Sequence, residues 1–208
     1  MSEAELSEQC QKKNKYAQNQ LYKQYAGILF ALCIRYIGHN ETAKDLLHDG
    51  FLKIYTSFDQ FSYRGEGSLK AWLCRVMVNT ILEYLRRNEK TKNFIPMDEI
   101  PESQDIPEER PPLALIPQEV IMKFIMELPI GYRTVFNLYT FEEKSHKEIA
   151  QLLGINEKSS SSQLYRAKSF LSKKIKEYLN KYEYENIENE NKGGRTMFAD
   201  MGICIDFM

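Results

Sequence analysis

The stretch Ser145–Phe170 reads SHKEIAQLLGINEKSSSSQLYRAKSF and holds four consecutive serines between two segments with helical patterning. Serine competes for backbone hydrogen bonds, so the serine run by its composition favours a flexible loop. Ser145 and Glu148 form a capping-box pattern that starts a short helix, and Gly154 supplies its end. Apolar spacing resumes at Leu164, so we expect the serines to lie in a second helix rather than in a linker.

Asn156 can cap that second helix, whose periodicity runs from Glu157 to about Leu179. Two helices joined by a glycine-containing turn, with the small Ala150 where they pack closely, are typical of a helix-turn-helix. In such a motif the second helix lies in the major groove of DNA. A plain helical hairpin with a solvated serine face explains the same residues, so both interpretations stay open on this segment alone.

The rest of the chain shows the same helical periodicity. Apolar stripes run through residues 21–36, 43–58, 69–85, 120–128 and 135–139. Asn40 and Ser68 are the expected N-caps of the second and third of these helices. No segment among the first three stripes alternates apolar and polar residues as a strand does. The sequence therefore predicts an all-α protein.

A proline-rich segment divides the chain. Residues 91–117 contain six prolines and six acidic residues. Proline removes backbone donors and favours extended geometry, so we expect a flexible acidic linker there. It separates a first helical domain, residues 15–90, from a second, residues 118–180. The Asn- and Glu-rich tail over residues 181–208 is expected to be disordered.

The net charge of −1 conceals a pattern along the 208 residues. Residues 1–90 and 118–181 carry net charges of +3 and +4, whereas residues 91–117 and 182–208 carry −4 each. Two mildly basic blocks therefore alternate with two acidic ones. No stretch approaches the roughly 20 apolar residues needed to span a bilayer, so we expect a cytoplasmic protein without membrane insertion.

Metal, disulfide and catalytic chemistry find little support in the sequence. The four cysteines are far apart without a CxxC pattern, and Cys33 and Cys74 fall on apolar helical faces where core thiols are expected. The histidines His39, His48 and His146 are scattered, and the glycines form no phosphate-binding loop. We therefore expect no metal, no cofactor and no enzymatic activity.

Three stretches in order resemble the extracytoplasmic-function group of bacterial RNA polymerase sigma factors. AKDLLHDGFLKIY (43–55) resembles the helix of that family that binds the polymerase clamp, and FSYRGEGSLKAWLCRVMVNTILEYLRR (61–87) resembles its promoter-melting loop and helix. LPIGYRTVFNLYTFEEKSHKEIAQLLGINEKSSSSQLYRAKSFL (128–171) resembles its second, helix-turn-helix domain. The likeness covers about residues 15–90 and 118–178.

The resemblance implies two all-helical domains on a flexible connector, in agreement with the periodicity. It also implies a function, the recruitment of core RNA polymerase to a promoter. In that family the second domain reads the upstream minus-35 element as duplex DNA, and the first melts the minus-10 element and captures it as a single strand. The implied partners are core polymerase and promoter DNA, with an anti-sigma factor as a further possible partner.

In the first domain, the loop and basic helix at residues 61–87 have the chemistry needed to hold single-stranded DNA, namely cations for phosphates and aromatic rings or pockets for bases. The candidate residues are Tyr63, Arg64, Lys70, Arg75, Asn79, Arg86 and Arg87. Tyr63 is the preferred candidate for base contact, with an ordinary surface tyrosine as the alternative. Trp72 falls on the apolar stripe, so we expect it in the core rather than as a stacking platform.

A polar helix face is the candidate polymerase-binding surface. Asp45, His48, Asp49 and Lys53 lie at helical spacing opposite the apolar stripe. On an isolated helix such a face is solvated surface, whereas the resemblance favours docking on the polymerase clamp. Gly50 lowers helix propensity by roughly 1 kcal/mol relative to alanine, which is compatible with the close approach of a partner.

In the second domain, the candidate duplex-binding residues are Lys144, Lys158, Ser159, Ser162, Gln163, Arg166 and Lys168. We expect Gln163 to carry sequence choice through a bidentate base contact, and the lysines to contact the phosphates of any sequence. Ser160 and Gln163 depart from the family, which often has a valine and a basic residue there. The bases read by this chain are therefore expected to differ from the usual ones.

A conventional helix-turn-helix regulator with a helical sensing or dimerising domain is the main alternative. It explains residues 145–170, but it does not explain the basic, glycine-punctuated loop and helix at residues 61–87. Binding of core polymerase discriminates between the two classes.

Overall fold

The structure is a computed structural model that describes residues 1–87 and 116–191, with the backbone alone for residues 182–191. Residues 88–115, which form most of the predicted acidic linker, and residues 192–208 of the tail lie outside the described residues. The expected flexibility of the linker and disorder of the last part of the tail therefore stay predictions.

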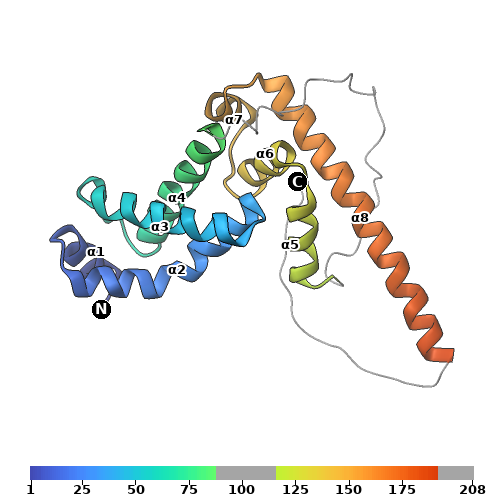
Figure 1. Ribbon diagram of the computed structural model, residues 1–208, viewed down its shortest axis with the longest axis horizontal. Helices are drawn as coiled ribbons and strands as arrows, with labels where there is room; N and C mark the ends of the chain where they lie inside the picture. The colour runs from blue at the N-terminus through green and yellow to red at the C-terminus, as the bar shows by residue number, and fades with distance from the viewer. Residues whose placement is uncertain (88–115, 192–208) are drawn as a thin grey trace. The chain divides into compact units, whose positions relative to one another are not determined.

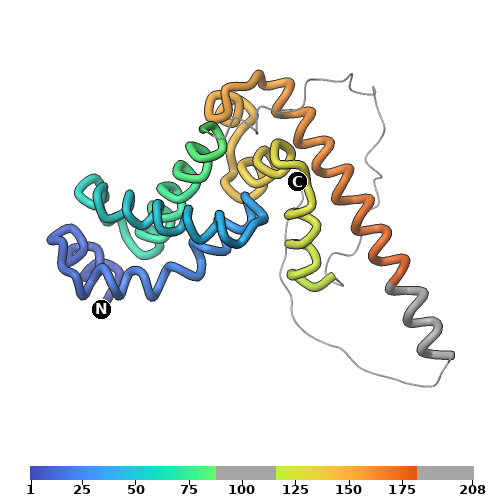
Figure 2. Tube along the Cα trace, in the orientation of Figure 1, coloured from blue at the N-terminus to red at the C-terminus, as the bar shows by residue number. Residues whose placement is uncertain are grey.

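Every regular element of the described residues is helical (Figures 1 and 2), which confirms the predicted all-α class. The chain divides into two compact units, Met1–Phe94 and Ile95–Met208. The first contains α1 (Glu3–Gln11), α2 (Lys15–Ile37), α3 (Asn40–Thr56), the short 3-10 helix η1 (Phe58–Gln60) and α4 (Ser68–Arg87). The second contains α5 (Gln118–Glu127), α6 (Ile130–Thr140), α7 (His146–Leu153) and α8 (Glu157–Asn191).

Local signals determine where the first helices begin and end. A capping box at Ser2 starts α1, and the side chain of Asn14 accepts two backbone N–H groups at the start of α2. Gly38 ends α2 in the left-handed conformation, with φ of 72°. The N-cap of α3 is His39 and not Asn40, the expected residue, which is the first residue of the helix.

The core of the first unit lies between α2, α3 and α4 (Figure 1). Leu29, Ile54 and Leu73 contribute one fully buried side chain from each helix. Gly50 is buried where α3 approaches α4, and a Cβ there would overlap the end of the Met77 side chain. The glycine therefore serves packing within the unit, and the proposed link to a partner is not needed to explain it.

Two cysteines contribute to this core. Cys10 of α1 and Cys33 of α2 are buried, and Cys74 of α4 is half-buried. Burial raises the pKa of the Cys10 thiol to about 11 and that of the Cys33 thiol to about 12. Both groups are therefore neutral thiols at physiological pH, which is the behaviour expected of core cysteines.

In the second unit, α6 and α7 pack against the first half of α8. Phe136, Ile149 and Leu171 are buried there, one from each helix. α5 is joined to α8 by an ion pair in which Nζ of Lys174 lies 2.8 Å from Oε2 of Glu127. The long helix α8 thus supports the three shorter helices of its unit.

α8 is longer than its apolar periodicity predicted. Disorder was expected from residue 181 onward, but the helix continues to Asn191. The disorder expected of the tail stays a prediction, and residues 181–191 are helical in the structure. These residues contain neither glycine nor proline, so no helix breaker lies among them despite their polar composition.

α7 and α8 form the predicted helix-turn-helix. Ser145 and Glu148 make both hydrogen bonds of the capping box, and Gly154 ends α7 in the left-handed conformation, with φ of 67°. The side chain of Asn156 accepts the N–H of Ser159 over 2.6 Å and so caps α8. Each local signal of this motif therefore has the structural role that the sequence predicts for it.

Gly154→Ala tests the turn of the motif. A Cβ at this position meets nothing within 4 Å, so the substitution changes the backbone energy without a clash. We expect the free energy of unfolding of the second unit to fall by about 1–2 kcal/mol, since alanine is disfavoured in the left-handed conformation. Gly27→Ala is the matched control, because Gly27 also faces open space but lies within α2.

The control substitution should stabilise the first unit by up to about 1 kcal/mol. Hydrogen exchange of the backbone amides in the full chain follows each unit separately. Unchanged protection of α7 and α8 in the Gly154→Ala variant would contradict the left-handed turn.

Candidate nucleic-acid and polymerase interfaces

The loop between η1 and α4 is a defined turn. Gly65 and Gly67 have φ of 114° and 83°, conformations that favour glycine. The Ser68 hydroxyl donates to the carbonyl of Gly65 over 2.6 Å and accepts the N–H of Arg64 over 3.2 Å. Ser68 is the first residue of α4 and closes the loop with its hydroxyl, instead of acting as the expected N-cap.

Three aromatic rings anchor the base of this loop. Phe58 and Phe61 are buried, and the ring centroid of each lies 5.1 Å from that of the half-buried Trp72. Trp72 therefore packs against two core rings, but it is itself half-buried rather than in the core as expected. The cluster fixes where the loop leaves η1 and where it reaches the first turn of α4.

The tip of the loop projects into solvent. Tyr63 is 42% exposed, and Arg64 and Glu66 are also exposed. A large exposed ring beside a guanidinium group can stack on a base and neutralise a phosphate. The structure thus brings together the two loop residues that the sequence assigned to base and phosphate contact.

The predicted cationic residues of α4 do not all share one face. Arg75 and Asn79 are exposed one turn apart, and Arg86 falls on the same side by helical spacing. Lys70 is exposed in the first turn but points in a different direction by the same spacing. A strand that follows the helix axis can therefore contact the first three residues together.

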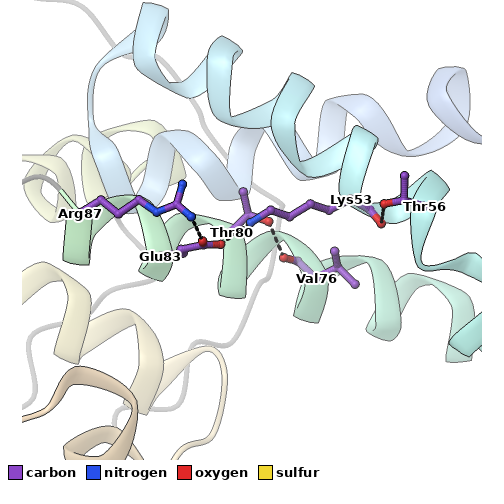
Figure 3. Close-up of polar contacts among 6 residues, drawn as sticks. All are labelled: Lys53, Thr56, Val76, Thr80, Glu83 and Arg87. Atoms are coloured by element: carbon purple, nitrogen blue, oxygen red, sulfur yellow. Dashed lines mark hydrogen bonds and ion pairs between the residues drawn. The ribbon is translucent and has the colours of Figure 1, made fainter.

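Glu83 links α3 to α4 through charged hydrogen bonds. It accepts from Lys53 of α3 and from Arg87 one turn along its own helix (Figure 3). The hydrogen bond and charge of Lys53, together with the charge of Arg87, hold the pKa of the Glu83 carboxyl below its ordinary value. Lys53 and Arg87, predicted to contact polymerase and DNA, therefore both have a partner within the unit.

The predicted polymerase-binding face of α3 contains an exposed leucine that sequence reasoning missed. Asp45, His48 and Asp49 are all exposed, as expected, and Leu52 is 63% exposed among them. Leu52 lies three, four and seven residues after these polar positions, which places it on their side of the helix. That spacing was the available signal, because it separates Leu52 from the apolar stripe of α3.

In α8, the side of the helix that faces solvent differs from the predicted one. Gln163 is 7% exposed and Ser160 is fully buried. The buried stripe begins at Ser160 and continues through Leu164, Ala167 and Leu171 at three- and four-residue spacing, with Gln163 at its edge. The expectation that Gln163 lies on the exposed face is therefore wrong, because Ser160 and not Leu164 begins the stripe.

A hydrogen bond explains how a serine begins this stripe. The hydroxyl of Ser160 lies 2.9 Å from Nδ1 of His146, the first residue of α7, and the His146 ring stacks on Tyr139 of α6. Oε1 of Gln163, by contrast, is buried without a hydrogen-bond partner among the described residues. Ser160 therefore contributes to the packing of the motif, whereas burial of Gln163 carries a desolvation cost.

The exposed side of α8 contains small hydroxyls together with a lysine, a tyrosine and the half-buried Arg166. Lys158 and Ser161 are exposed, and Ser159, Ser162 and Tyr165 are half-buried beside them. Sequence reasoning missed Tyr165, although it lies three residues after Ser162 and seven after Lys158 and so shares their side. Its ring is the largest side chain on this face.

Three further predicted cations of the second unit have internal contacts. Nη1 of Arg166 donates to the hydroxyl of Tyr132 over 3.1 Å, and Nζ of Lys168 lies 5.6 Å from the ring centroid of Tyr139. Lys144 pairs with the carboxylate of the α7 capping box over 3.3 Å. All three are half-buried. Arg166 lies four residues after Ser162 and seven after Ser159, so it shares their side of α8.

The described side chains give no indication of a metal centre. No three His, Cys, Asp or Glu residues among them come together in a group that could hold an ion. Within the described residues, no helix has the length and apolar character needed to cross a membrane.

Comparison with known families agrees with the order of the two units. The profile described as Sigma-70 region 2 matches residues 21–91, and that described as Sigma-70, region 4 matches residues 118–171. Together they cover more than half of the 208 residues. The chain belongs to the sigma-70 family of RNA polymerase sigma factors.

Two relatives are similar over nearly their whole length. The ECF RNA polymerase sigma-E factor of Haemophilus influenzae is 27% identical over 184 residues, which are 84% of this chain and 96% of that protein. The RNA polymerase sigma factor YlaC of Bacillus subtilis is 28% identical over 169 residues, which are 78% of this chain and 94% of that protein. Within its family the chain falls in the extracytoplasmic-function group, whose members are DNA-binding initiation factors and not enzymes.

Among solved structures, the co-crystal structure of the sigma factor RpoE with the anti-sigma factor NepR from Bartonella quintana is similar at 22% identity and a TM-score of 0.46. The aligned part covers 76% of this chain and 96% of that one.

Gln163→Leu tests the corrected position of Gln163. Leucine removes a buried oxygen that has no partner and restores an apolar edge to the stripe. We expect the free energy of unfolding of the second unit to rise by about 1 kcal/mol, with the preference for upstream DNA sequences unchanged. Hydrogen exchange in the full chain and a binding selection over randomised upstream elements measure the two effects. A relaxed sequence preference would restore Gln163 as a base reader.

Glu83→Gln tests the link between α3 and α4 through its pH dependence. A carboxyl whose pKa is lowered by folding stabilises the folded state above its unfolded pKa, and this contribution is lost as pH falls through the folded pKa. We therefore expect the variant to be less stable than the native protein at pH 7. The difference should shrink as pH falls below about 4.3, the ordinary Glu pKa, and vanish below the lowered pKa of the folded state. High salt should also reduce it, because the group is partly exposed. A difference that does not shrink as pH falls would assign the effect to packing.

Proposed function

We propose that this sigma factor binds core RNA polymerase through its first unit, captures the melted minus-10 element with the loop and α4 of that unit, and reads the minus-35 element as duplex with α7 and α8. The observation that carries the proposal is the loop of residues 61–68. Its closed turn presents Tyr63 and Arg64 to solvent ahead of the cationic face of α4. Single-stranded DNA is held by this combination, since rings stack on bases and cations neutralise phosphates.

Within this site we assign Tyr63 to an extruded base and Arg64 to a neighbouring phosphate. Arg75, Asn79 and Arg86 then follow the strand along α4, because they share one exposed side of the helix. Lys70 and Arg87 border the site, the first on another side of α4 and the second already paired with Glu83. We expect these two to contribute less than the shared face.

For core polymerase, we propose that Leu52 is the apolar anchor of the α3 face and that Asp45, His48 and Asp49 form its polar rim. An apolar centre within a polar rim is the usual arrangement of a protein interface. Lys53 belongs to the edge of this surface, where it holds α3 against α4 through Glu83. Exposure alone does not define an interface, and the match of residues 21–91 to sigma-70 region 2 is the independent support.

For the duplex element, we propose that Lys158, Ser161, Ser162 and Tyr165 face the major groove. Serine hydroxyls can contact bases or phosphates with little selectivity, so Tyr165 and Arg166 are the residues with reach for base edges on this side. The start of α8 near Ser159 favours a phosphate, because backbone N–H groups and the helix dipole converge there. Lys144 and Lys168 supply salt-dependent affinity for any sequence.

A conventional helix-turn-helix regulator is not favoured, because the first unit also matches a sigma factor region. The proposed role places the protein in the cytoplasm, where polymerase and promoter DNA meet. An anti-sigma partner remains an expectation drawn from the family resemblance.

Three alanine variants separate the two activities proposed for the first unit. Tyr63→Ala and Arg64→Ala should reduce open-complex formation on duplex promoters by about 5- to 100-fold, since one stacking contact contributes about 1–3 kcal/mol. Both should bind core polymerase normally. Leu52→Ala should weaken core binding by about tenfold, as expected for an anchor worth somewhat more than 1 kcal/mol.

Fluorescence anisotropy with labelled protein measures core affinity, and permanganate reactivity of thymines measures opening. Tyr16→Ala is the control for loss of an exposed ring, because Tyr16 is 65% exposed on α2. If Tyr63→Ala and Arg64→Ala open promoters like the native protein, the loop is not the capture site. If the native chain fails to bind core polymerase, the regulator alternative replaces the whole proposal.

A further inference from the structure

Helix α1 lies outside the segment matched by sigma-70 region 2, which begins at residue 21. It is nevertheless an ordered part of the first unit, because Leu6, Ser7 and Cys10 are buried. Its capping box, formed by Ser2 and Glu5, fixes its own first turn. The exposed side of α1 is therefore held in a defined orientation relative to the helices on which it packs.

The first helical residue of α1 caps a different helix. Oε2 of Glu3 accepts the N–H of Gly67 over 2.9 Å, and Oε1 accepts the N–H of Leu69 over 2.8 Å. These N–H groups lie at the start of α4, where no partner within the helix is available to them. A carboxylate is well suited to this place, since charge-assisted hydrogen bonds and the helix dipole both favour it.

The last residue of α1 holds the other end of the same loop. Nε2 of Gln11 donates to the carbonyl of Phe61 over 2.7 Å. Glu3 and Gln11 are separated by two turns of helix, or roughly 12 Å along the axis. α1 therefore contacts the loop at both ends and fixes the span between Phe61 and Gly67.

Between these two contacts, the hydrogen bonds that the loop makes within itself are confined to residues 64–68. The hydroxyl of Ser68 donates to the carbonyl of Gly65 and accepts the N–H of Arg64, and the N–H of Ser68 donates to the same carbonyl over 3.1 Å. Tyr63 and Arg64 stand at the exposed tip. Glycine reaches many backbone conformations at low cost, so a loop with Gly65 and Gly67 needs external contacts to keep one of them.

We propose that α1 is the positioning element of the strand-capture loop and that Glu3 and Gln11 are its positioning residues. The inference rests on the function proposed above for the loop, and it adds the part of the chain that prepares the loop for DNA. The two side chains do not touch the strand. The hydrogen bonds of Glu3 and Gln11 raise the fraction of molecules in which Tyr63 and Arg64 are already placed to receive the strand. When that fraction falls, the apparent affinity for the single strand falls in proportion.

The test compares Glu3→Gln, Gln11→Ala and the double variant with Glu8→Gln. Glu3→Gln keeps the shape of the side chain but replaces one acceptor by a donor and removes the charge. Glu8→Gln removes the same charge from α1, where Glu8 forms an exposed pair with Lys12. The probe is a fluorescent single-stranded oligonucleotide with the minus-10 sequence selected by the native holoenzyme, measured against a scrambled strand.

In holoenzymes assembled from full-length chains, we expect Glu3→Gln and Gln11→Ala each to weaken binding of the selected strand by about five- to thirtyfold, the ratio that corresponds to the loss of one capping interaction. Binding of the scrambled strand and of core polymerase should change less than twofold. Hydrogen exchange at the loop amides should become faster in both variants. Glu8→Gln should behave like the native protein in every assay.

Two results would overturn the inference. The first is strand binding by Glu3→Gln and Gln11→Ala equal to that of Glu8→Gln. The second is a parallel loss of core affinity, thermal stability and strand binding, which would make α1 a folding element only. Tyr63→Ala and Arg64→Ala in the same assay test the loop itself. If these two bind the selected strand normally, the proposed function of the loop fails first and the role of α1 fails with it.

Discussion

Every helix starts with backbone N–H groups that have no partner within the helix, and this constraint organises both units. α1, α2 and α7 satisfy it locally through Ser2, Asn14 and Ser145. α4 satisfies it at long range, through Glu3 of α1. A helix with a local cap can form wherever its own segment folds, whereas the start of α4 depends on the placement of another helix. The position of the loop that precedes α4 therefore also depends on the placement of α1.

Much of the fold was predictable because most of its signals are local. The capping box at Ser145 and the stop at Gly154 place α7 from a few residues of sequence. The start of α3 was misplaced by one residue, because the ring of His39 accepts the N–H of Thr42 and takes the role expected of Asn40. The length of α8 beyond Leu179 was missed, because the apolar periodicity ends there whereas the helix continues to Asn191.

The candidate sites were predictable to the extent that they depend on helical spacing alone. Asp45, His48 and Asp49 of α3 are exposed as expected, because an apolar stripe determines the opposite face. Gln163 was misplaced because the stripe of α8 begins at Ser160, whose burial depends on a hydrogen bond to His146. No periodicity rule includes that contact, since it joins two helices through polar atoms. The same reason hid the role of Glu3, which is more than 60 residues away from the N–H groups that it binds.

The two proposed DNA contacts place different demands on the protein. Duplex DNA is stiff, so a face on the rigid helix α8 needs only the packing that orients the helix. A single strand is flexible, and it loses conformational freedom when it is captured. A flexible loop would add its own entropy loss to that of the strand and weaken binding. In the proposed site, the hydrogen bonds of α1 to both loop ends would reduce this second loss before DNA arrives, while the tip residues stay exposed. The same argument explains why the support comes from α1, which lies outside the loop. Stronger hydrogen bonds within the loop would occupy the backbone and side chains that the strand has to reach.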